Sequence, residues 1–337
     1  MVKFDNFTAK YLKFFFDKRS NYILPGLKDL KRQVSKSINT NINYKIEDYT
    51  ISLSKINKLA DTEWVDQDIL NNLDPLTKNK KISWTYKKID HNIYIKTTVE
   101  KFSSLQDRLV ILLNMLNFLY DQKEIKEERP INMYLVLSSL KKQLIDEKFI
   151  KTNTIDVKNV NSGYTDFIVN EIFIWREEEF EKVIFHEMVH YMDLDVRNMA
   201  FSDKDLPHDI NGPKSYYEAF TDVWANIYHL IYLSLLTKKS VDSLFQIEFQ
   251  FIKNQANLFN NVFELKDWSK RKVVKQNTPA FTYYILKYLI FEKIIKAKTL
   301  DILKQPKELL TQIFSERFKE NSYFNVNSTR MTLIQIK

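Results

Sequence analysis

Residues 171–191 read EIFIWREEEFEKVIFHEMVHY, and this stretch decides how the chain around it can fold. Residues 172–175 form a short run of large apolar side chains, which predicts a buried strand. Four of the five residues 177–181 are glutamates, where negative charge favours the first turn of a helix. Val183, Phe185 and Val189 then supply apolar positions for burial. The stretch therefore predicts a strand that leads directly into a helix.

The predicted helix carries two histidines four residues apart, in the run His186-Glu187-Met188-Val189-His190. Positions i and i+4 share one helical face, so both imidazoles can reach one metal ion. Glu187 lies about 100° round the helix, where it can lean over a zinc-bound water. This arrangement indicates zinc-assisted hydrolysis, most often of a peptide bond, with Glu187 as general base. The alternative is a helix with two surface histidines.

A catalytic zinc needs a third protein ligand. Metzincins have Gly seven residues and His or Asp ten residues after the first histidine, but here Asp193 and Val196 stand there. Further on, Glu218 and Asp222 share a helical face at i and i+4. We expect Glu218 to bind zinc, and Asp222 to accept a hydrogen bond from a ligand histidine and so fix its tautomer.

Other roles stay open for these acidic residues. Ser215 and Glu218 have the spacing of a capping box, which would explain Glu218 as part of a helix start. Asp193 and Asp195 are rival ligands or hydrogen-bond partners of the ligands. Asp193 shares the stripe of the two histidines, but three ligands from one straight helix cannot easily close around a tetrahedral ion. Glu218 is therefore ranked ahead of it.

Hydrolysis also needs a donor that stabilises the oxyanion of the tetrahedral intermediate, usually Tyr, His or Arg. The candidates, with the preferred one first, are His208, Tyr216, Tyr217 and His229. His229 shares the face of Glu218 but lies roughly 16 Å along the helix, too far to bind the same ion. His91 stands in an Asp-His-Asn sequence that predicts a hairpin turn.

The Glu-x-x-x-Asp segment after His-Glu-x-x-His resembles the gluzincin group of zinc metallopeptidases, to which thermolysin-like enzymes belong. More specifically, the chain is similar to uncharacterised metallopeptidase-like proteins of giant DNA viruses over roughly residues 130 to 235. The matching segments are 161–165 (NSGYT), 171–178 (EIFIWREE), 182–187 (KVIFHE) and 217–225 (YEAFTDVWA).

This resemblance implies Zn²⁺ as cofactor, His186, His190 and Glu218 as ligands, and Glu187 as base. The chain departs from thermolysin-like enzymes in two respects. The spacing from His190 to Glu218 is longer (218 − 190 = 28 residues), and the second acid is Asp222. These departures leave the identity of the remaining site groups open.

The expected fold class is α+β and mainly helical, since only 3 Gly stand against 18 Tyr and 24 Phe. A mixed N-terminal region (1–127) precedes a zincin-like catalytic domain (128–238) with a small sheet and the active-site helix. A helical C-terminal region (239–337) follows, and by analogy forms the other wall of the cleft. The expected strands are residues 82–89, 93–99, 131–138, 166–169 and 172–175; the expected helices are 104–120, 140–147, 240–266 and one that opens at Thr278-Pro279.

The strand directly before the metal helix is expected to lie at the edge of the sheet, where it would bind an extended peptide by main-chain hydrogen bonds. An ordinary sheet strand is the alternative.

Composition limits the context. The chain of 337 residues is 44% hydrophobic and 28% charged, which is typical of a globular protein. It has no cysteine, so disulfides and thiolate metal ligands are excluded. The longest apolar runs, 109–120 and 283–295, are interrupted and too short to cross a membrane, and no secretory signal opens the chain. The net charge of +8 is spread over Lys-rich faces, so nucleic-acid binding is not favoured.

We therefore expect a non-secreted, cytoplasmic zinc metalloendopeptidase that acts on a protein or peptide. The abundance of Lys, Asn and Ile indicates an AT-rich genome. For a viral source, the role would be viral protein processing and the location the host cytoplasm or the virion. The competing hypothesis is a non-catalytic zinc-containing structural protein whose partners are other virion proteins. A fourth protein ligand, from Asp193 or His208, would favour that hypothesis, because structural zinc sites are closed.

Overall fold

The computed structural model describes residues 4–16, 23–24, 26–73, 77–122, 128–143, 145, 154–197, 209–212, 215–263, 273–315 and 328–335. Its strands are β1 (Tyr44–Asp48), β2 (Thr77–Tyr86), β3 (Ile89–Thr98), β4 (Asn132–Ser138), β5 (Gly163–Asp166), β6 (Glu171–Arg176), β7 (Asp209–Asn211) and β8 (Val273–Lys275). Its helices up to the metal motif are α1 (Asn6–Phe16), α2 (Leu27–Ser37), α3 (Leu53–Ala60), α4 (Asp68–Asn71), α5 (Val99–Gln106), α6 (Leu109–Asp121), α8 (Val157–Val160) and α9 (Phe180–Tyr191). The remaining helices are α10 (Tyr217–Thr237), α11 (Val241–Val262), the π-helical η2 (Thr282–Leu286), α12 (Lys287–Ala297), the 3-10 helix η3 (Asp301–Lys304) and α13 (Pro306–Ser315).

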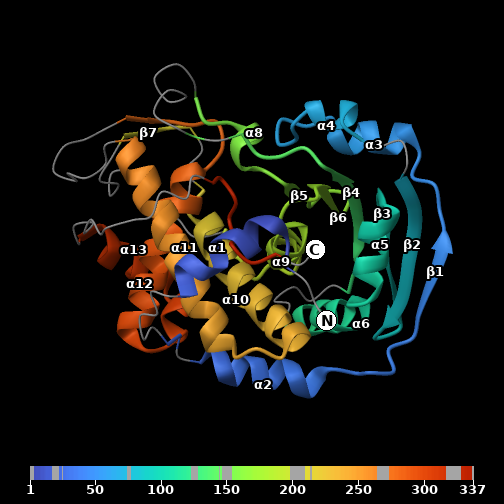
Figure 1. Cartoon of the computed structure of the whole chain (residues 1–337), viewed down its shortest axis with the longest axis horizontal. Coiled ribbons are helices and arrows are strands. Elements are labelled where there is room, and N and C mark those ends of the chain that lie inside the picture. The colour runs from blue at the N-terminus through green and yellow to red at the C-terminus, as the bar shows by residue number, and fades with distance from the viewer. Residues whose placement is uncertain are drawn as a thin grey trace.

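Six strands form one mixed sheet in the order β1-β2-β3-β4-β6-β5 (Figure 1). Strands β1 to β3 are antiparallel, β3, β4 and β6 are parallel, and β5 returns antiparallel to β6 at the end of the sheet. The predicted α+β class is confirmed. The expected boundary between residues 127 and 128 falls between α6 and β4, and strands from both sides of it pair with each other.

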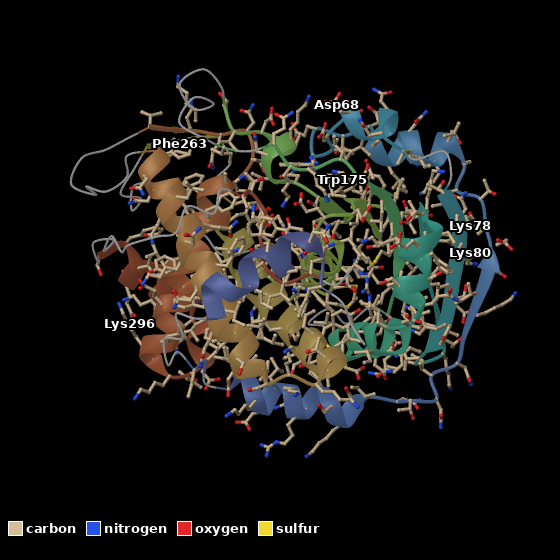
Figure 2. The ribbon with its side chains drawn as sticks, viewed as in Figure 1. Asp68, Lys78, Lys80, Trp175, Phe263 and Lys296 are labelled. Atoms are coloured by element: carbon tan, nitrogen blue, oxygen red, sulfur yellow. The ribbon has the colours of Figure 1, made fainter. Side chains whose placement is uncertain are left out.

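Both faces of the central strands are covered, which explains why their sequences are continuously apolar. Alternate side chains of β4 and β6 belong to two different cores. The side chains in the main core, shared with α6, α9 and α10, are Met133, Leu135, Ile172 and Ile174. Those in the smaller core under α3 are Tyr134, Val136, Phe173 and Trp175. Trp175 is buried inside the molecule, whereas Lys78, Lys80 and Lys296 lie at its periphery (Figure 2).

The metal-motif helix α9 lies in the middle of the molecule, between the sheet and the C-terminal helices (Figure 1). Glu179 ends the turn after β6 in a left-handed conformation (φ 56°), and every residue of α9 is buried. Glu179 also accepts the backbone N–H groups of Met331 and Thr332. The described C-terminal residues 328–335 are therefore part of the core beside α9.

The hairpin predicted around Asp90-His91-Asn92 is real, but its turn was placed wrongly. The turn is Lys87-Lys88, both with positive φ (50° and 66°), and β3 begins at Ile89. Asn and Asp favour such two-residue turns, so the sequence pointed to the wrong pair. His91 instead lies in β3, is buried against Trp84, and accepts the N–H of Ile131 on Nδ1 (2.9 Å).

Three other predictions near the sheet were wrong. Residues 167–170 form a turn and not a strand, because the second strand of that hairpin begins at Glu171. The described part of the helix predicted over 140–147, residues 140–143 and 145, is not helical. The strand before the metal helix, β6, is not an edge strand, since β5 and β4 flank it; the edge is β5.

The helix predictions were better. The segment predicted as one helix over 104–120 is divided into α5 and α6 at Asp107-Arg108. The helix predicted over 240–266 is present as α11, and its last residues lie outside the described residues. The predicted helix start at Thr278-Pro279 is confirmed, since helical structure begins at Ala280. None of the helices in the described ranges has both the length and the apolar character needed to cross a lipid bilayer.

Candidate metal centre

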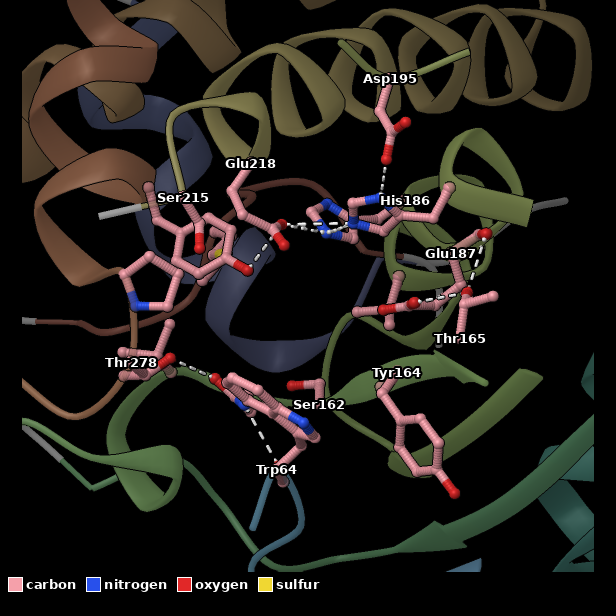
Figure 3. Close-up of a pocket in the computed structure, with 18 of the residues that line it drawn as sticks. Trp64, Ser162, Tyr164, Thr165, His186, Glu187, Asp195, Ser215, Glu218 and Thr278 are labelled. Carbon is pink, nitrogen blue, oxygen red and sulfur yellow. Dashed lines mark hydrogen bonds and ion pairs between the residues drawn. The ribbon is translucent and has the colours of Figure 1, made fainter. Parts of the chain in front are cut away.

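Helices α9 and α10 bring three side-chain donor atoms together (Figure 3). Nε2 of His186 lies 3.2 Å from Nε2 of His190 and 3.1 Å from Oε2 of Glu218, and Nε2 of His190 lies 3.3 Å from the same oxygen. In a tetrahedral zinc site with bonds of about 2.0–2.1 Å, two ligand atoms lie about 3.3–3.4 Å apart. The three donors are thus spaced as one face of a zinc-sized tetrahedron.

Nδ1, the second ring nitrogen of each imidazole, faces a carboxylate. Nδ1 of His186 lies 3.1 Å from Oδ1 of Asp222, and Nδ1 of His190 lies 2.5 Å from Oδ2 of Asp195. A carboxylate accepts only, so each Nδ1 carries a proton, and an imidazole in its neutral form presents a lone pair on Nε2. Two lone pairs and a carboxylate oxygen then point at one another, an arrangement that a divalent cation stabilises.

Electrostatics indicate how the cluster behaves without a cation. Burial lowers the pKa of His186 to about 3, so this imidazole stays neutral. Burial also disfavours charge on His190, but the charge of Glu218 and the hydrogen bond to Asp195 outweigh it and raise the pKa of His190 to about 10. The pKa of Glu218 is lowered, because the two imidazoles outweigh its own burial. One proton, on His190, thus occupies the place that a metal ion would take.

Glu187 lies on the side of the cluster that faces β5. Its Oε2 accepts the hydroxyl of Thr165 (2.9 Å), and burial raises the pKa of the carboxyl group to about 7. Strand β5 approaches this closely because residue 163 is glycine. A Cβ at Gly163 would lie 2.7 Å from Cγ1 of Val183 and 3.1 Å from Oε1 of Glu187. The glycine thus lets the edge strand run beside the carboxyl group.

Tyr283 is a site residue that sequence reasoning missed. Its hydroxyl donates to Oε2 of Glu218 (2.9 Å), and its ring lies 5.9 Å from that of His186. It belongs to the π-helical segment η2, a rare geometry that is frequent at functional sites. The only signal in the sequence was the helix start at Thr278-Pro279, which places Tyr283 in the first turns of a helix but not beside Glu218.

The other predicted site residues are placed as follows. Glu218 points at the two imidazoles, and α10 has no side-chain hydrogen bond at its N-cap, so the capping-box alternative does not hold. Asp193 pairs with Arg197 (2.8 Å) away from the donors, and Asp195 contacts His190 without joining the donors. Within the part of the chain that the structure describes, no fourth His, Asp or Glu joins the cluster.

The residues predicted as candidates for the oxyanion donor differ in whether they line the cleft. Tyr216 is buried against Phe314, whereas the ring of Tyr217 lies 5.9 Å from that of His190 and lines the cleft. His229 is buried away from the cleft, in contact with Phe185 and Tyr232. His208 lies outside the described residues.

A cleft of about 280 Å³ opens on the donors. One wall is β5 with Ser162, and another is formed by Thr278, Pro279 and Tyr283 from the C-terminal region. Trp64 and Phe167, both partly exposed, lie on its rim. The cleft is therefore bounded by β5, the last strand of the described sheet, on one side and by the helical region on the other.

No family model and no solved structure matches the chain. The chain is 30% identical over 89 residues to the uncharacterised protein R210 of Acanthamoeba polyphaga mimivirus. That match covers 25% of this chain and 23% of the viral protein, so it spans less than a quarter of that relative. The similarity is to a protein of a giant DNA virus and carries no assigned function.

Proposed function

We propose that the chain is a zinc-dependent metalloendopeptidase of gluzincin type. One observation carries the proposal: two imidazole nitrogens and one carboxylate oxygen lie 3.1–3.3 Å apart, beside a cleft that also holds a buried carboxyl group. Three protein ligands with one side left for water are the usual arrangement of catalytic zinc. The similarity to a giant-virus protein supports a viral source, and with it a role in viral protein processing.

In this proposal His186, His190 and Glu218 hold the metal. Zinc in such a site acts as a Lewis acid that polarises a carbonyl group and makes water a nucleophile at neutral pH. Glu187 accepts the proton of the attacking water and returns it to the leaving amine nitrogen. A base works best when its pKa is close to the working pH, and burial raises the pKa of Glu187 to about 7. Thr165 orients the carboxyl group by its hydrogen bond.

Tyr283 supplies the donor for the developing oxyanion by turning its hydroxyl hydrogen from Glu218 to that oxygen. Its pKa is raised well above the ordinary value by burial and by the charge of Glu218, so its hydroxyl keeps its proton. Removing one such donor typically slows catalysis by about 100- to 1,000-fold. Tyr283 takes this role in place of His208, the donor preferred from the sequence.

The substrate binds as an extended polypeptide along β5. Among the described residues this strand pairs only with β6, and residues 162–165 line the cleft. An exposed strand edge accepts a peptide by main-chain hydrogen bonds, with little dependence on the side chains. The sequence led us to expect peptide binding at β6, the strand before α9. The proposal places it at β5, one strand earlier in the chain.

The test combines metal content with a search for new peptide termini. The purified full-length protein is loaded with Zn²⁺ and incubated with a proteome-derived peptide library, and products are identified by mass spectrometry. Glu187→Gln keeps all three ligands, so it should retain zinc and lose cleavage. Glu177→Gln is the matched control, because Glu177 is partly exposed and pairs with Lys101 instead of the cluster.

Two results would contradict the proposal. Loss of zinc in Glu187→Gln would show that Glu187 is a ligand and not a base. Stoichiometric zinc without cleavage by the wild-type protein would favour the non-catalytic structural protein.

A further inference from the structure

Each imidazole of the candidate metal centre contacts a carboxyl group, and each of these carboxyl groups contacts one or two basic side chains. Asp195, behind His190, pairs with Arg197 (2.8 Å), whose side chain is 22% exposed. Asp222, behind His186, has no exposed surface and pairs with two lysines that are each only 1% exposed. The two sides of the cluster therefore differ: the basic side chain on one side is partly exposed, and the two basic side chains on the other side are buried.

The two buried lysines come from different helices. Lys182 lies on α9, one turn before His186, and contacts Oδ1 of Asp222, the oxygen that also faces His186. Lys287 is the first residue of α12, and its Nζ lies 2.8 Å from Oδ2 of Asp222. Lys287 also donates to the backbone carbonyl of Met331 (3.2 Å). Both oxygens of Asp222 are thus held, one from each side.

A buried carboxylate needs such partners. Moving an ionised carboxyl group out of water is strongly unfavourable unless nearby charges and hydrogen bonds offset it. The single contact with His186 leaves Oδ2 of Asp222 without compensation. With both lysines in place, each oxygen of Asp222 has a basic partner, and the carboxyl group cannot rotate away from His186. The tautomer of His186, and hence the lone pair on its Nε2, depends on that acceptor.

We propose that Lys182 and Lys287 are positioning residues that hold Asp222 as the hydrogen-bond acceptor for His186 and so set the affinity of the donor cluster for a divalent cation. The inference rests on the proposed function in taking that cation to be zinc. It adds that two residues without contact to the metal control how tightly the metal binds.

The test measures Zn²⁺ affinity of the full-length protein by competition with a chromogenic chelator, and thermal unfolding of the metal-free protein. Lys287→Met and Lys182→Met should weaken zinc binding between about 10- and 100-fold, the range typical for groups that orient a ligand. Lys142→Met is the matched control, because Lys142 is equally buried but pairs with Glu179 and not with Asp222. It should lower the unfolding temperature and leave zinc affinity unchanged.

A double-mutant cycle tests whether the lysines act through Asp222. In an Asp222→Asn background, Lys287→Met should weaken zinc binding little further, because the acceptor that Lys287 holds is already lost. Additive losses, or an equal loss in Lys142→Met, would overturn the inference. If Lys287→Met does not fold, Lys182→Met carries the same cycle. Absence of zinc binding in the wild-type protein would instead contradict the proposed function.

Discussion

The two ends of the packed pair α9 and α10 place histidines in opposite electrostatic environments. At the cleft end, His190 faces Glu218 and Asp195, and its pKa is raised to about 10. At the core end, His229 lies against the rings of Phe185 and Tyr232, and burial lowers its pKa to about 3. Both side chains are almost completely buried. Burial is the largest cause that lowers the pKa of His229, whereas at His190 the charge of Glu218 and the hydrogen bond to Asp195 outweigh burial.

The two histidines also differ in their hydrogen-bond partners. Neither ring nitrogen of His229 has a hydrogen-bond partner among the described residues. Nδ1 of His190 faces Oδ2 of Asp195, and Nε2 of His190 faces Oε2 of Glu218 and Nε2 of His186. A buried polar group without a partner is costly, so His229 is expected to lower stability, whereas the partners of His190 compensate its burial.

Removing the carboxylate at the cleft end should have the largest effect. Glu218→Ala leaves two imidazoles to hold the ion, so zinc affinity should fall on the order of 100- to 1,000-fold, since a few ligands share a binding free energy of about 10–16 kcal/mol. Chelator competition measures the change. Ser215→Ala is the control, because it removes the hydroxyl group of the rejected capping box. Its zinc affinity should stay within a few-fold of the wild-type value. An unchanged affinity in Glu218→Ala would remove Glu218 from the metal site.

The raised pKa of His190 predicts that zinc affinity rises with pH. Binding must displace the proton of His190, so affinity should increase about tenfold per pH unit between pH 7 and 9. Calorimetry in two buffers of different ionisation enthalpy should count about one proton released per ion at pH 8. A pH-independent affinity would mean that His190 is already neutral.

For the metal-free protein, the raised pKa of His190 predicts that the free energy of unfolding falls as the pH rises. Its pKa in the folded state lies above the value of about 6.5 in the unfolded chain, so the folded state binds the extra proton between these values. The stabilisation is complete below pH 6.5 and is lost as the pH rises through about 10. Urea unfolding of the metal-free protein at pH 7 and pH 9.5 measures the loss, which Zn²⁺ should abolish.

His229 should give the smallest effect, visible only in acid. Its folded pKa of about 3 lies below that of the unfolded chain, so between pH 6.5 and 3 only the unfolded state takes up the proton. This side chain should therefore cost the wild-type protein about 2 kcal/mol between pH 7 and pH 5. His229→Phe should remove that loss, as measured by urea unfolding at the two pH values. Equal losses in both proteins would contradict the assigned pKa.

Local patterns accounted for much of the fold near the site. The strand over residues 172–175 and the helix that follows it could be predicted because their side-chain periodicity lies within a few residues. The i, i+4 spacing of His186 and His190 fixes their common face for the same reason. The hairpin of β2 and β3 was predicted correctly, but the position of its turn was not. The turn uses Lys87-Lys88, and lysine does not indicate a turn.

The amino-acid sequence by itself determined the α+β class, the strand-to-helix unit and which residue types stand on the inner face of α9, since all of these follow from neighbours within a few turns. Only the tertiary structure decided that Glu218 meets both imidazoles, that Tyr283 donates to Glu218, and that β5 and not β6 is the last strand at that end of the described sheet. Lys287 and Asp222 are likewise 65 residues apart in sequence (287 − 222 = 65) yet form an ion pair. The physical reason is that these contacts depend on how whole helices pack, and packing is set by the summed burial of many side chains and not by any short spacing.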